Sequence, residues 1–202
     1  MNRLARLTAA VFAAAMLVSA PAQAQLYSDG FKFLQAVDKK DGDEAQKLLD
    51  KPGSTVVNAR DISDGHTALH ICVERRDLTW IKWLGQQGAN PNISDNRGVT
   101  PLILAAQLNF IEGVEALIKA GAQVDVANNA GETPLMYAVH SDNRLLAEVL
   151  LKAGADPDRR DNSGRSAREY AEARPRMLDT IVEHARPVEE REGARRVYGP
   201  SF

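Results

Sequence analysis

The sequence is poor in the features that mark several common protein classes. Its one cysteine, Cys72, cannot form a disulfide within the chain. Aromatic residues make up 5% of the chain, and the formal net charge at pH 7 is −2. Nucleic-acid binding typically needs a clustered basic face. Glycine-rich phosphate loops are absent, and no nucleophile, base and carboxylate stand in a catalytic pattern. We therefore expect neither an enzyme nor a nucleic-acid-binding protein, and no cofactor or metal.

The one long apolar stretch lies at the N-terminus, at residues 7–18. Two arginines precede it, and Ala-Gln-Ala at residues 22–24 is a small-x-small cleavage site. This pattern predicts a signal peptide at residues 1–24, cut between Ala24 and Gln25. The apolar stretch is shorter than the roughly 20 residues of a membrane-spanning helix, so we expect no membrane insertion after cleavage.

The alanine-rich signal resembles a Gram-negative secretory signal. The periplasm is therefore the first expectation for its location, and secretion from the cell is the second. Cleavage would also remove two arginines and no acidic residue, which leaves 23 basic against 27 acidic residues and a net charge of −4. This weakly acidic net charge gives the protein no broad electrostatic attraction for a polyanion such as a nucleic acid.

The dominant feature is a repeat of 33 residues, marked by Gly65, Gly98, Gly131 and Gly164. Each glycine opens a related phrase: Gly-His-Thr-Ala-Leu-His, Gly-Val-Thr-Pro-Leu-Ile, Gly-Glu-Thr-Pro-Leu-Met and the degraded Gly-Arg-Ser-Ala-Arg-Glu. A fixed period of this length is typical of a solenoid, in which each unit packs on its neighbours.

Each repeat carries helix start and stop signals. Threonine can cap a helix through its hydroxyl, and proline suits the first helical turn. Glycine after the second helix allows the left-handed conformation of a C-cap. These signals predict first helices at residues 68–75, 101–108 and 134–141, and second helices at 78–86, 111–119 and 144–152.

The phrase Gly-x-Thr-Pro-Leu-x-x-Ala, the paired helices and the closing Leu-x-x-Gly-Ala-Asp resemble the ankyrin repeat. This resemblance implies an all-α solenoid of stacked helix–turn–helix units with β-hairpin loops. It divides the chain after the signal peptide (1–24) into a degenerate N-terminal capping unit (25–60), full repeats (61–94, 95–127 and 128–160) and a C-terminal capping repeat (161–184). The end of the chain mixes charges with Pro187 and Gly193 and has little apolar content, which predicts a disordered tail (185–202). Within the first unit we expect a polar lead at 25–30 and a helix from Phe31.

Two irregularities interrupt the period. One extra residue falls in the turn at residues 61–64, so the first loop should be longer than the others. Trp80 stands where the next repeat has Gly113, which predicts that its ring packs across the stack toward Gly113.

His70 occupies the histidine position of the ankyrin phrase, and the resemblance implies that its ring bridges adjacent repeats by hydrogen bonding. His66 lies four residues earlier and Cys72 two later, which raises a metal or catalytic alternative. Two ligand types without a closed set of four are weak evidence for zinc. A buried structural cysteine is the favoured interpretation of Cys72.

The resemblance also implies that a partner protein meets the concave face, formed by the loop tips and the exposed side of each first helix. These are positions that the stack does not need. The residues in this register are Ser63, Asp64, His66, Glu74, Arg75, Asn96, Arg97, Val99, Gln107, Leu108, Asn129, Ala130, Glu132, His140, Ser141, Asn162, Ser163 and Arg165.

The sequence therefore predicts a non-enzymatic, monomeric periplasmic adaptor that binds another protein of unknown identity. The alternative from the same fold is a secreted effector or inhibitor that acts on a protein outside the producing cell. A face that is merely solvated also fits the pattern of mixed charges.

Overall fold

A computed structural model describes residues 22–185, with side chains described from Asp29 onward. Most of the predicted signal peptide and all but the first residue of the predicted tail lie outside this part of the chain. The helices of the described residues are α1 (Ala22–Asp38), α2 (Gly42–Leu49), the 3₁₀ helix η1 (Val56–Asn58), α3 (Ala68–Glu74), α4 (Leu78–Gln86), α5 (Pro101–Gln107), α6 (Ile111–Lys119), α7 (Pro134–His140), α8 (Arg144–Lys152), α9 (Ala167–Ala171) and α10 (Pro175–His184).

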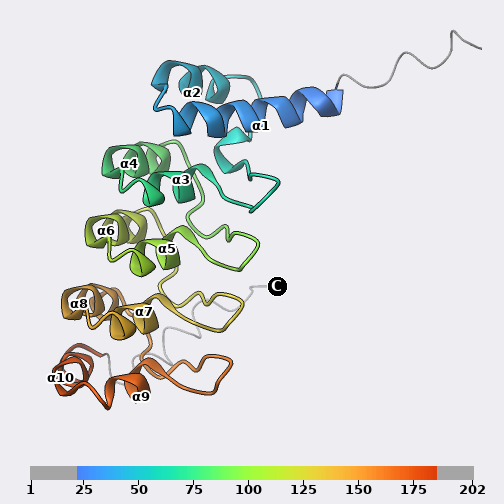
Figure 1. Cartoon of the computed structure of the whole chain (residues 1–202). Helices are drawn as coiled ribbons and strands as arrows, with labels where there is room; N and C mark the ends of the chain where they lie inside the picture. The colour runs from blue at the N-terminus through green and yellow to red at the C-terminus, as the bar shows by residue number, and fades with distance from the viewer. Residues whose placement is uncertain (1–21, 186–202) are drawn as a thin grey trace, which may run out of the picture.

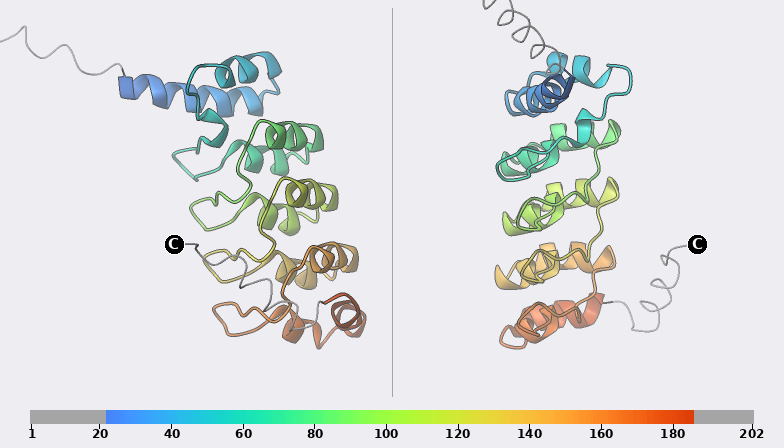
Figure 2. Two further views of the ribbon diagram at one scale, coloured as in Figure 1. Left: turned by 180° about the vertical axis from the view of Figure 1, so that it is seen from behind. Right: turned by 90° about the vertical axis from the view of Figure 1, so that its right-hand side faces the viewer.

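Successive α-helices pair and the pairs stack along one axis (Figure 1). The odd-numbered helices contact one another in order from α1 to α9, and the even-numbered helices from α4 to α10 form a second layer. The loops that join successive pairs from α3 onward all project from the same edge of the stack (Figure 2). This arrangement confirms the all-α solenoid.

Helix boundaries follow the local signals. Thr100 and Thr133 accept hydrogen bonds from the backbone N–H groups of Ile103 and Met136, at 3.3 and 3.4 Å. Pro101 and Pro134 stand in the first turn of their helices. The glycines after the second helices have φ values of 81°, 92° and 98°, at Gly88, Gly121 and Gly154 respectively. The predicted second helices coincide with α4, α6 and α8, and the first helices end one residue earlier than expected.

The turn between the two helices is strained in each of the pairs α3–α4, α5–α6 and α7–α8, and no glycine in the sequence indicates it. Arg76, Asn109 and Asp142 have φ near 51°, the left-handed region that residues with a Cβ rarely adopt. Arg76 gains compensating contacts, because its guanidinium lies 5.7 Å from the centre of the Phe110 ring and donates to the Leu108 carbonyl. The 33-residue spacing makes this conformation a property of the repeat.

The expected polar lead at residues 25–30 is wrong, because α1 begins at Ala22 and continues through Gly30 to Asp38. Gly30 does not break the helix. A Cβ added there would lie 3.2 Å from the Cβ of Ala59, so glycine permits the chain after η1 to pass close to α1. The later half of α1 buries Phe33 and Val37 in the core.

Trp80 does not pack toward Gly113. The space beside Gly113 is filled by the ring of Phe110, which an added Cβ would strike. Trp80 instead meets Trp83 edge to face, with ring centroids 4.9 Å apart. Both rings line a groove with Gly42 and Gln46 of α2, so they face the N-terminal unit.

The loops turn back on themselves, yet the described residues form isolated β-bridges rather than continuous strands, as at Arg60 with Thr67. The first loop is longer, as predicted. Its turn is closed by the Gly65 N–H donating to the Asp61 carbonyl four residues earlier. In the second loop Gly98 donates to Asp95, only three residues earlier.

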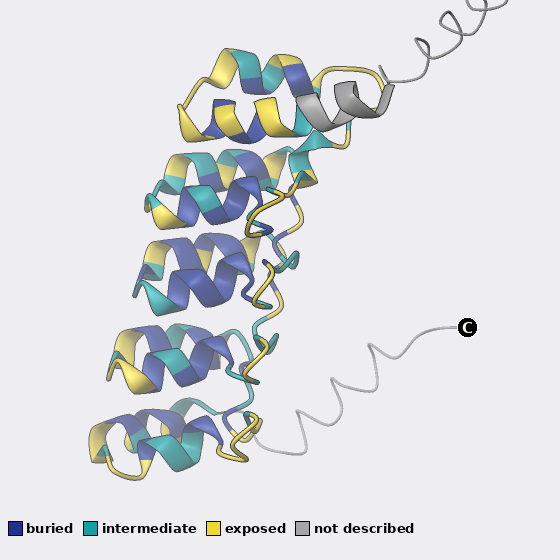
Figure 3. Ribbon diagram, turned by 45° about the vertical axis from the view of Figure 1, so that its right-hand side comes forward, coloured by how far each residue is buried: buried dark blue, intermediate teal, exposed yellow. Residues whose placement is uncertain are grey.

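Burial follows the layers, with the inner helix surfaces buried and the loop tips exposed (Figure 3). The core consists mainly of leucine, isoleucine, valine and alanine from all five pairs. No helix of the described residues is long and apolar enough to cross a membrane.

Candidate functional site

The predicted concave face divides into residues that face solvent and residues that the stack uses. Val99 belongs to the second group, and its inclusion is wrong as a surface position. It is 4% exposed, and its N–H donates to Asp95 Oδ1 at 2.8 Å. The carbonyl of Val99 contacts the His70 ring, as described below. A partner could not reach its side chain without opening the loop.

Three asparagines of the predicted face connect successive loop tips. We call Asn96, Asn129 and Asn162 the asparagine ladder. The Nδ2 groups of Asn96, Asn129 and Asn162 donate to the carbonyls of the preceding loop, namely those of Ser63 at 3.2 Å, Asn96 at 3.3 Å and Asn129 at 2.9 Å. Their backbone N–H groups donate to the preceding loop as well. The ladder therefore holds the loop tips in fixed register, and the premise that the stack does not need these positions fails here.

Arg75 also serves the stack. Its Nη1 donates to the Val37 carbonyl at 2.8 Å and to the Asp38 carbonyl, at the C-terminal end of α1. A cation is favourable at that end because the helix dipole is negative there. Arg75 lies 3.6 Å from Asp77 Oδ2 in addition. These contacts join α1 to α3, so Arg75 supports the packing of these two helices.

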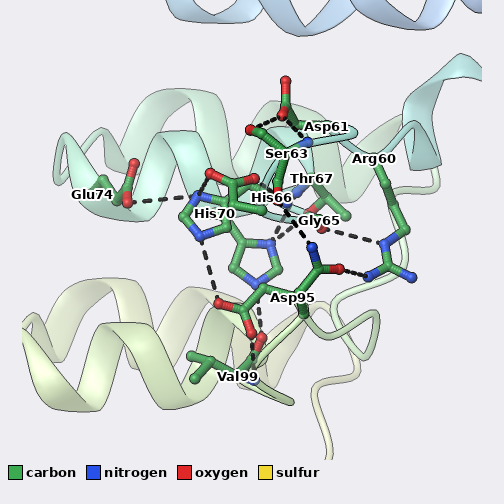
Figure 4. Close-up of polar contacts among 12 residues, drawn as sticks. Arg60, Asp61, Ser63, Gly65, His66, Thr67, His70, Glu74, Asp95 and Val99 are labelled. Carbon is green, nitrogen blue, oxygen red and sulfur yellow. Dashed lines mark hydrogen bonds and ion pairs between the residues drawn. The ribbon is translucent and has the colours of Figure 1, made fainter.

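His66 lies in a network of carboxylates rather than free on the surface (Figure 4). Its Nδ1 is 3.5 Å from Asp64 Oδ2 and 3.6 Å from Glu74 Oε1, and its Nε2 is 3.6 Å from Asp95 Oδ2. The side chain of His66 is 12% exposed. It therefore joins the first loop to the second repeat.

Asp95 is the buried member of this network. Burial alone would raise the pKa of its carboxyl, but the N–H groups of Val99 and Arg97 and the Arg97 guanidinium overcome that effect and hold the pKa below its usual value. The Arg97 guanidinium lies 3.0 Å from Asp95 Oδ2. Asp95 thus remains an anion that organises its own loop.

His70 bridges adjacent repeats, as the resemblance implies. Its Nε2 lies 3.0 Å from the Val99 carbonyl, and the Thr67 N–H donates to its Nδ1 at 3.1 Å. The ring stacks on that of His66, with centroids 5.0 Å apart. Burial lowers the pKa of His70 to about 4, so the ring is neutral at pH 7.

The metal alternative finds no support in this arrangement. Among residues 22–185 no three histidine, cysteine or carboxylate side chains are placed to hold a metal ion. Cys72 is fully buried, and burial raises the pKa of its thiol to about 12. The thiol is therefore protonated at neutral pH, which is unfavourable for a nucleophile or ligand.

Two tyrosines on this face are absent from the predicted set. Tyr137 Oη donates to Glu132 Oε2 at 2.5 Å, and Tyr170 Oη donates to Asp161 Oδ2 at 2.6 Å. Burial and the bond to Glu132 raise the pKa of Tyr137. The hydrogen bond from Tyr170, followed by that from Ser163, lowers the pKa of Asp161. Both tyrosines are therefore held in place by carboxylates of their own repeats.

Exposed side chains surround these tyrosines. The His140 ring meets Tyr170 edge to face at 4.6 Å and Tyr137 at 6.5 Å. The Arg165 guanidinium lies 5.8 Å from the centre of the Tyr170 ring, within the range of a cation–π contact. This cluster of aromatic rings, imidazole and guanidinium offers apolar area and hydrogen-bond donors to a partner.

The remaining predicted residues lie as follows. Ser63, Asp64, Glu74, Arg97, Ala130, Ser141 and Ser163 are exposed, and Gln107, Leu108 and Glu132 are partly buried. The face therefore combines a rigid framework with a smaller set of displayed side chains.

Comparison with known proteins decides the family. A model described as ankyrin repeats in three copies matches residues 33–128 and residues 81–161. The chain belongs to the ankyrin repeat family. Ankyrin repeats indicate a protein–protein interaction module, and the family is generally non-enzymatic.

Two curated proteins are similar to part of the chain. The chain is 30% identical to Oxysterol-binding protein homolog 1 of Saccharomyces cerevisiae over 81 residues, 39% of the chain and 7% of the relative. It is 35% identical to Nuclear factor NF-kappa-B p110 subunit of Drosophila melanogaster over 63 residues, 31% of the chain and 6% of the relative. The matches thus span a small part of each relative's length.

Proposed function

We propose that this ankyrin repeat protein is a periplasmic adaptor that binds a partner protein through its concave face. The contact is centred on exposed side chains of the last full repeat and the C-terminal capping repeat, namely Ala130, His140 and Arg165. The partner is a folded protein or a protein segment, because the face mixes both charges with aromatic rings. Rigid presentation of these groups limits the entropy lost on association.

The proposal rests on one observation, which is that some residues of the face hold the loops in place while others are exposed to a partner. The asparagine ladder fixes the loop tips, so side chains between its members are held at constant separation. His140 and Arg165 are exposed, and both contact the ring of Tyr170. Tyr170 is held by Asp161, and the neighbouring Tyr137 is held by Glu132. Aromatic and arginine side chains are enriched among residues that contribute most to binding.

Site-specific photo-crosslinking tests the location of the interface. A photoreactive residue placed at position 140 should form a covalent product with a partner protein in the producing cells. The same residue at position 115 should not, because Glu115 is exposed on α6, in the other helix layer. The products are detected by electrophoresis and identified by mass spectrometry.

Both variants must unfold at the same urea concentration as the unmodified protein, which excludes an effect of misfolding. Products from position 115 with none from position 140 would place the interface on the even-numbered helices and overturn the proposed face. Arg165→Glu should weaken the product formed at position 140 by reversing the displayed charge. Lys82→Glu on α4 is the matched control for this substitution.

The periplasmic location rests on residues 1–24, and we expect the mature chain to begin at Gln25. Cleavage there would remove only the first three residues of α1. N-terminal sequencing of the protein from fractionated cells provides the test, and Ala24→Leu should block processing by removing the small residue before the cut. A protein that retains Met1 contradicts export, and recovery from the culture supernatant favours the secreted alternative.

A further inference from the structure

The first loop and α1 enclose a small apolar pocket outside the predicted concave set. It has a volume of about 190 Å³ and is lined by Gly30, Phe31, Leu34, Ala59, Arg60, Asp61 and Ile62. Pockets for small-molecule ligands typically measure about 300–1,000 Å³. This pocket is therefore of the size for one inserted side chain.

The lining contains side chains that a folded protein ordinarily covers. Phe31 is 55% exposed and Ile62 is 72% exposed. They are two of the four large exposed hydrophobic residues of the described chain, and both line the same pocket. Single exposed hydrophobic residues are common and need no explanation, whereas here two of them lie side by side in the lining of one pocket.

Ile62 is the residue that lengthens the first loop. In each loop the first Asp or Asn accepts a hydrogen bond from the N–H two residues later, as Asp61 does from Ser63 and Asp95 from Arg97. The N–H of Asn96 then meets the Asp64 carbonyl, as that of Asn129 meets the Arg97 carbonyl. Asp64 thus matches Arg97 and Ser63 matches Asn96, which leaves Ile62 as the extra position.

The loop stack explains why this position is open. The second, third and fourth loops each lie against a preceding loop through the asparagine ladder. Within residues 22–60 the structure shows α1, α2 and η1 but no loop that stacks on the first loop through an asparagine ladder. The side of the first loop that carries Ile62 therefore faces α1 across the pocket.

Arg60 gives the rim of the pocket a cationic group. Its Nε lies 3.3 Å from the Gly65 carbonyl and its Nη2 lies 3.4 Å from Asn96 Oδ1, both neutral acceptors. No carboxylate within residues 29–185 forms an ion pair with it at 4.0 Å or less. Asp61 is already engaged by Ser63, through its N–H and its hydroxyl.

We propose that this pocket binds a partner-protein segment in which a large aliphatic or aromatic side chain lies next to a carboxylate. The apolar side chain enters between Phe31 and Ile62, and the carboxylate pairs with the Arg60 guanidinium. Ser63 and Asp64 of the concave face directly follow Ile62 in the first loop, so the same partner can span the pocket and that face. The inference rests on the proposed function and names a determinant of partner choice.

Selection from a displayed library of random peptides tests the inference, with the chain purified in the form recovered from its producing cell. The selected peptides should share an apolar residue beside Asp or Glu. Ile62→Ser should weaken binding of a selected peptide at least tenfold, since burial of one large apolar side chain accounts for that factor. Leu145→Ser is the matched control, because Leu145 is 57% exposed on α8 and lies outside the pocket. Arg60→Glu should shift selection toward Lys and Arg beside the apolar residue.

Selection of peptides without this pairing, or binding unchanged in Ile62→Ser, overturns the inference. Loss of binding in Arg165→Glu but not in Ile62→Ser also overturns the pocket inference, and it leaves the concave-face proposal intact. Retention of binding in Arg165→Glu with loss in Ile62→Ser supports the pocket alone, and the photo-crosslinking at position 140 then decides the concave face separately. If the chain's own N-terminal residues fill the pocket, Ile62→Ser lowers the unfolding midpoint without altering peptide selection, which also overturns it.

Discussion

Lowering the pH from 6.5 to 4 is expected to reduce the free energy of unfolding by about 3 kcal/mol through His70 alone. The pKa of His70 is about 4 in the folded protein, against 6.5 for an unperturbed histidine. In this interval the unfolded chain binds a proton at His70 and the folded chain does not. The contribution of His70 to the free energy of unfolding is therefore present above pH 6.5, decreases as the pH falls, and is largely lost near pH 4.

The low pKa of His70 has a structural cause. The ring is fully buried, and burial disfavours its charged form more than the Val99 carbonyl and the nearby Asp95 favour it. The Thr67 N–H donates to Nδ1, so Nε2 carries the proton and donates to Val99. Protonation of Nδ1 would place its N–H opposite the Thr67 N–H, so the hydrogen bond between them would be lost.

Urea unfolding at pH 7 and pH 5 measures this effect, since about 2 kcal/mol of it falls in that range and most carboxylates titrate lower, and comparison with a His70 variant assigns it to that ring. His70→Met is the matched variant, because Met136 occupies the equivalent position and its Sδ lies 3.5 Å from the Thr133 N–H. The variant should be less stable at pH 7 yet less sensitive to pH. Equal sensitivity in both proteins would show that His70 is not the responsible group.

The fold was predictable because its signals are local. Threonine caps, first-turn prolines and left-handed glycines act within a few residues, and their recurrence every 33 residues identifies the stack. Gly30 shows the limit of such signals. Glycine usually weakens a helix, but here it allows Ala59 to approach α1, and that contact exists only after η1 folds back.

The candidate site was less predictable because it depends on contacts between repeats. An asparagine at a loop tip can face solvent or the next loop, and the sequence of one repeat does not distinguish the two. The recurrence of Asn96, Asn129 and Asn162 at the repeat spacing was the available signal that the stack uses them. Tyr137 and Tyr170 also lie 33 residues apart, at the position that Leu104 occupies in the preceding repeat. The change from leucine to tyrosine was the available signal that this part of the face is aromatic.

The stabilising role of the ladder predicts a large difference between two chemically identical substitutions. Gly131→Ala should destabilise the protein by about 2–5 kcal/mol, and Gly164→Ala by about 1–2 kcal/mol. Both glycines have a φ of 81°, so the left-handed backbone penalty is the same. The difference must come from what the new methyl group meets.

At Gly131 an added Cβ would lie 2.7 Å from the backbone nitrogen of Asn162 and 2.9 Å from the Cα of Asp161. Backbone atoms cannot rotate away as a flexible side chain can, so the next loop must shift. At Gly164 no atom lies within 4 Å, because no further loop follows in the described chain. The comparison therefore separates loop stacking from local strain.

Urea unfolding supplies the two free energies, and hydrogen exchange at the Asn162 amide reports the local effect. That amide donates to the Ala130 carbonyl at 3.0 Å and should exchange faster in Gly131→Ala than in Gly164→Ala. Gly98→Ala should behave like Gly131→Ala, since its Cβ would lie 2.8 Å from the Asn129 nitrogen. Equal losses at Gly131 and Gly164 would mean that the loops stack without mutual support. The fixed spacing of His140 and Arg165 would then have to come from the helices alone.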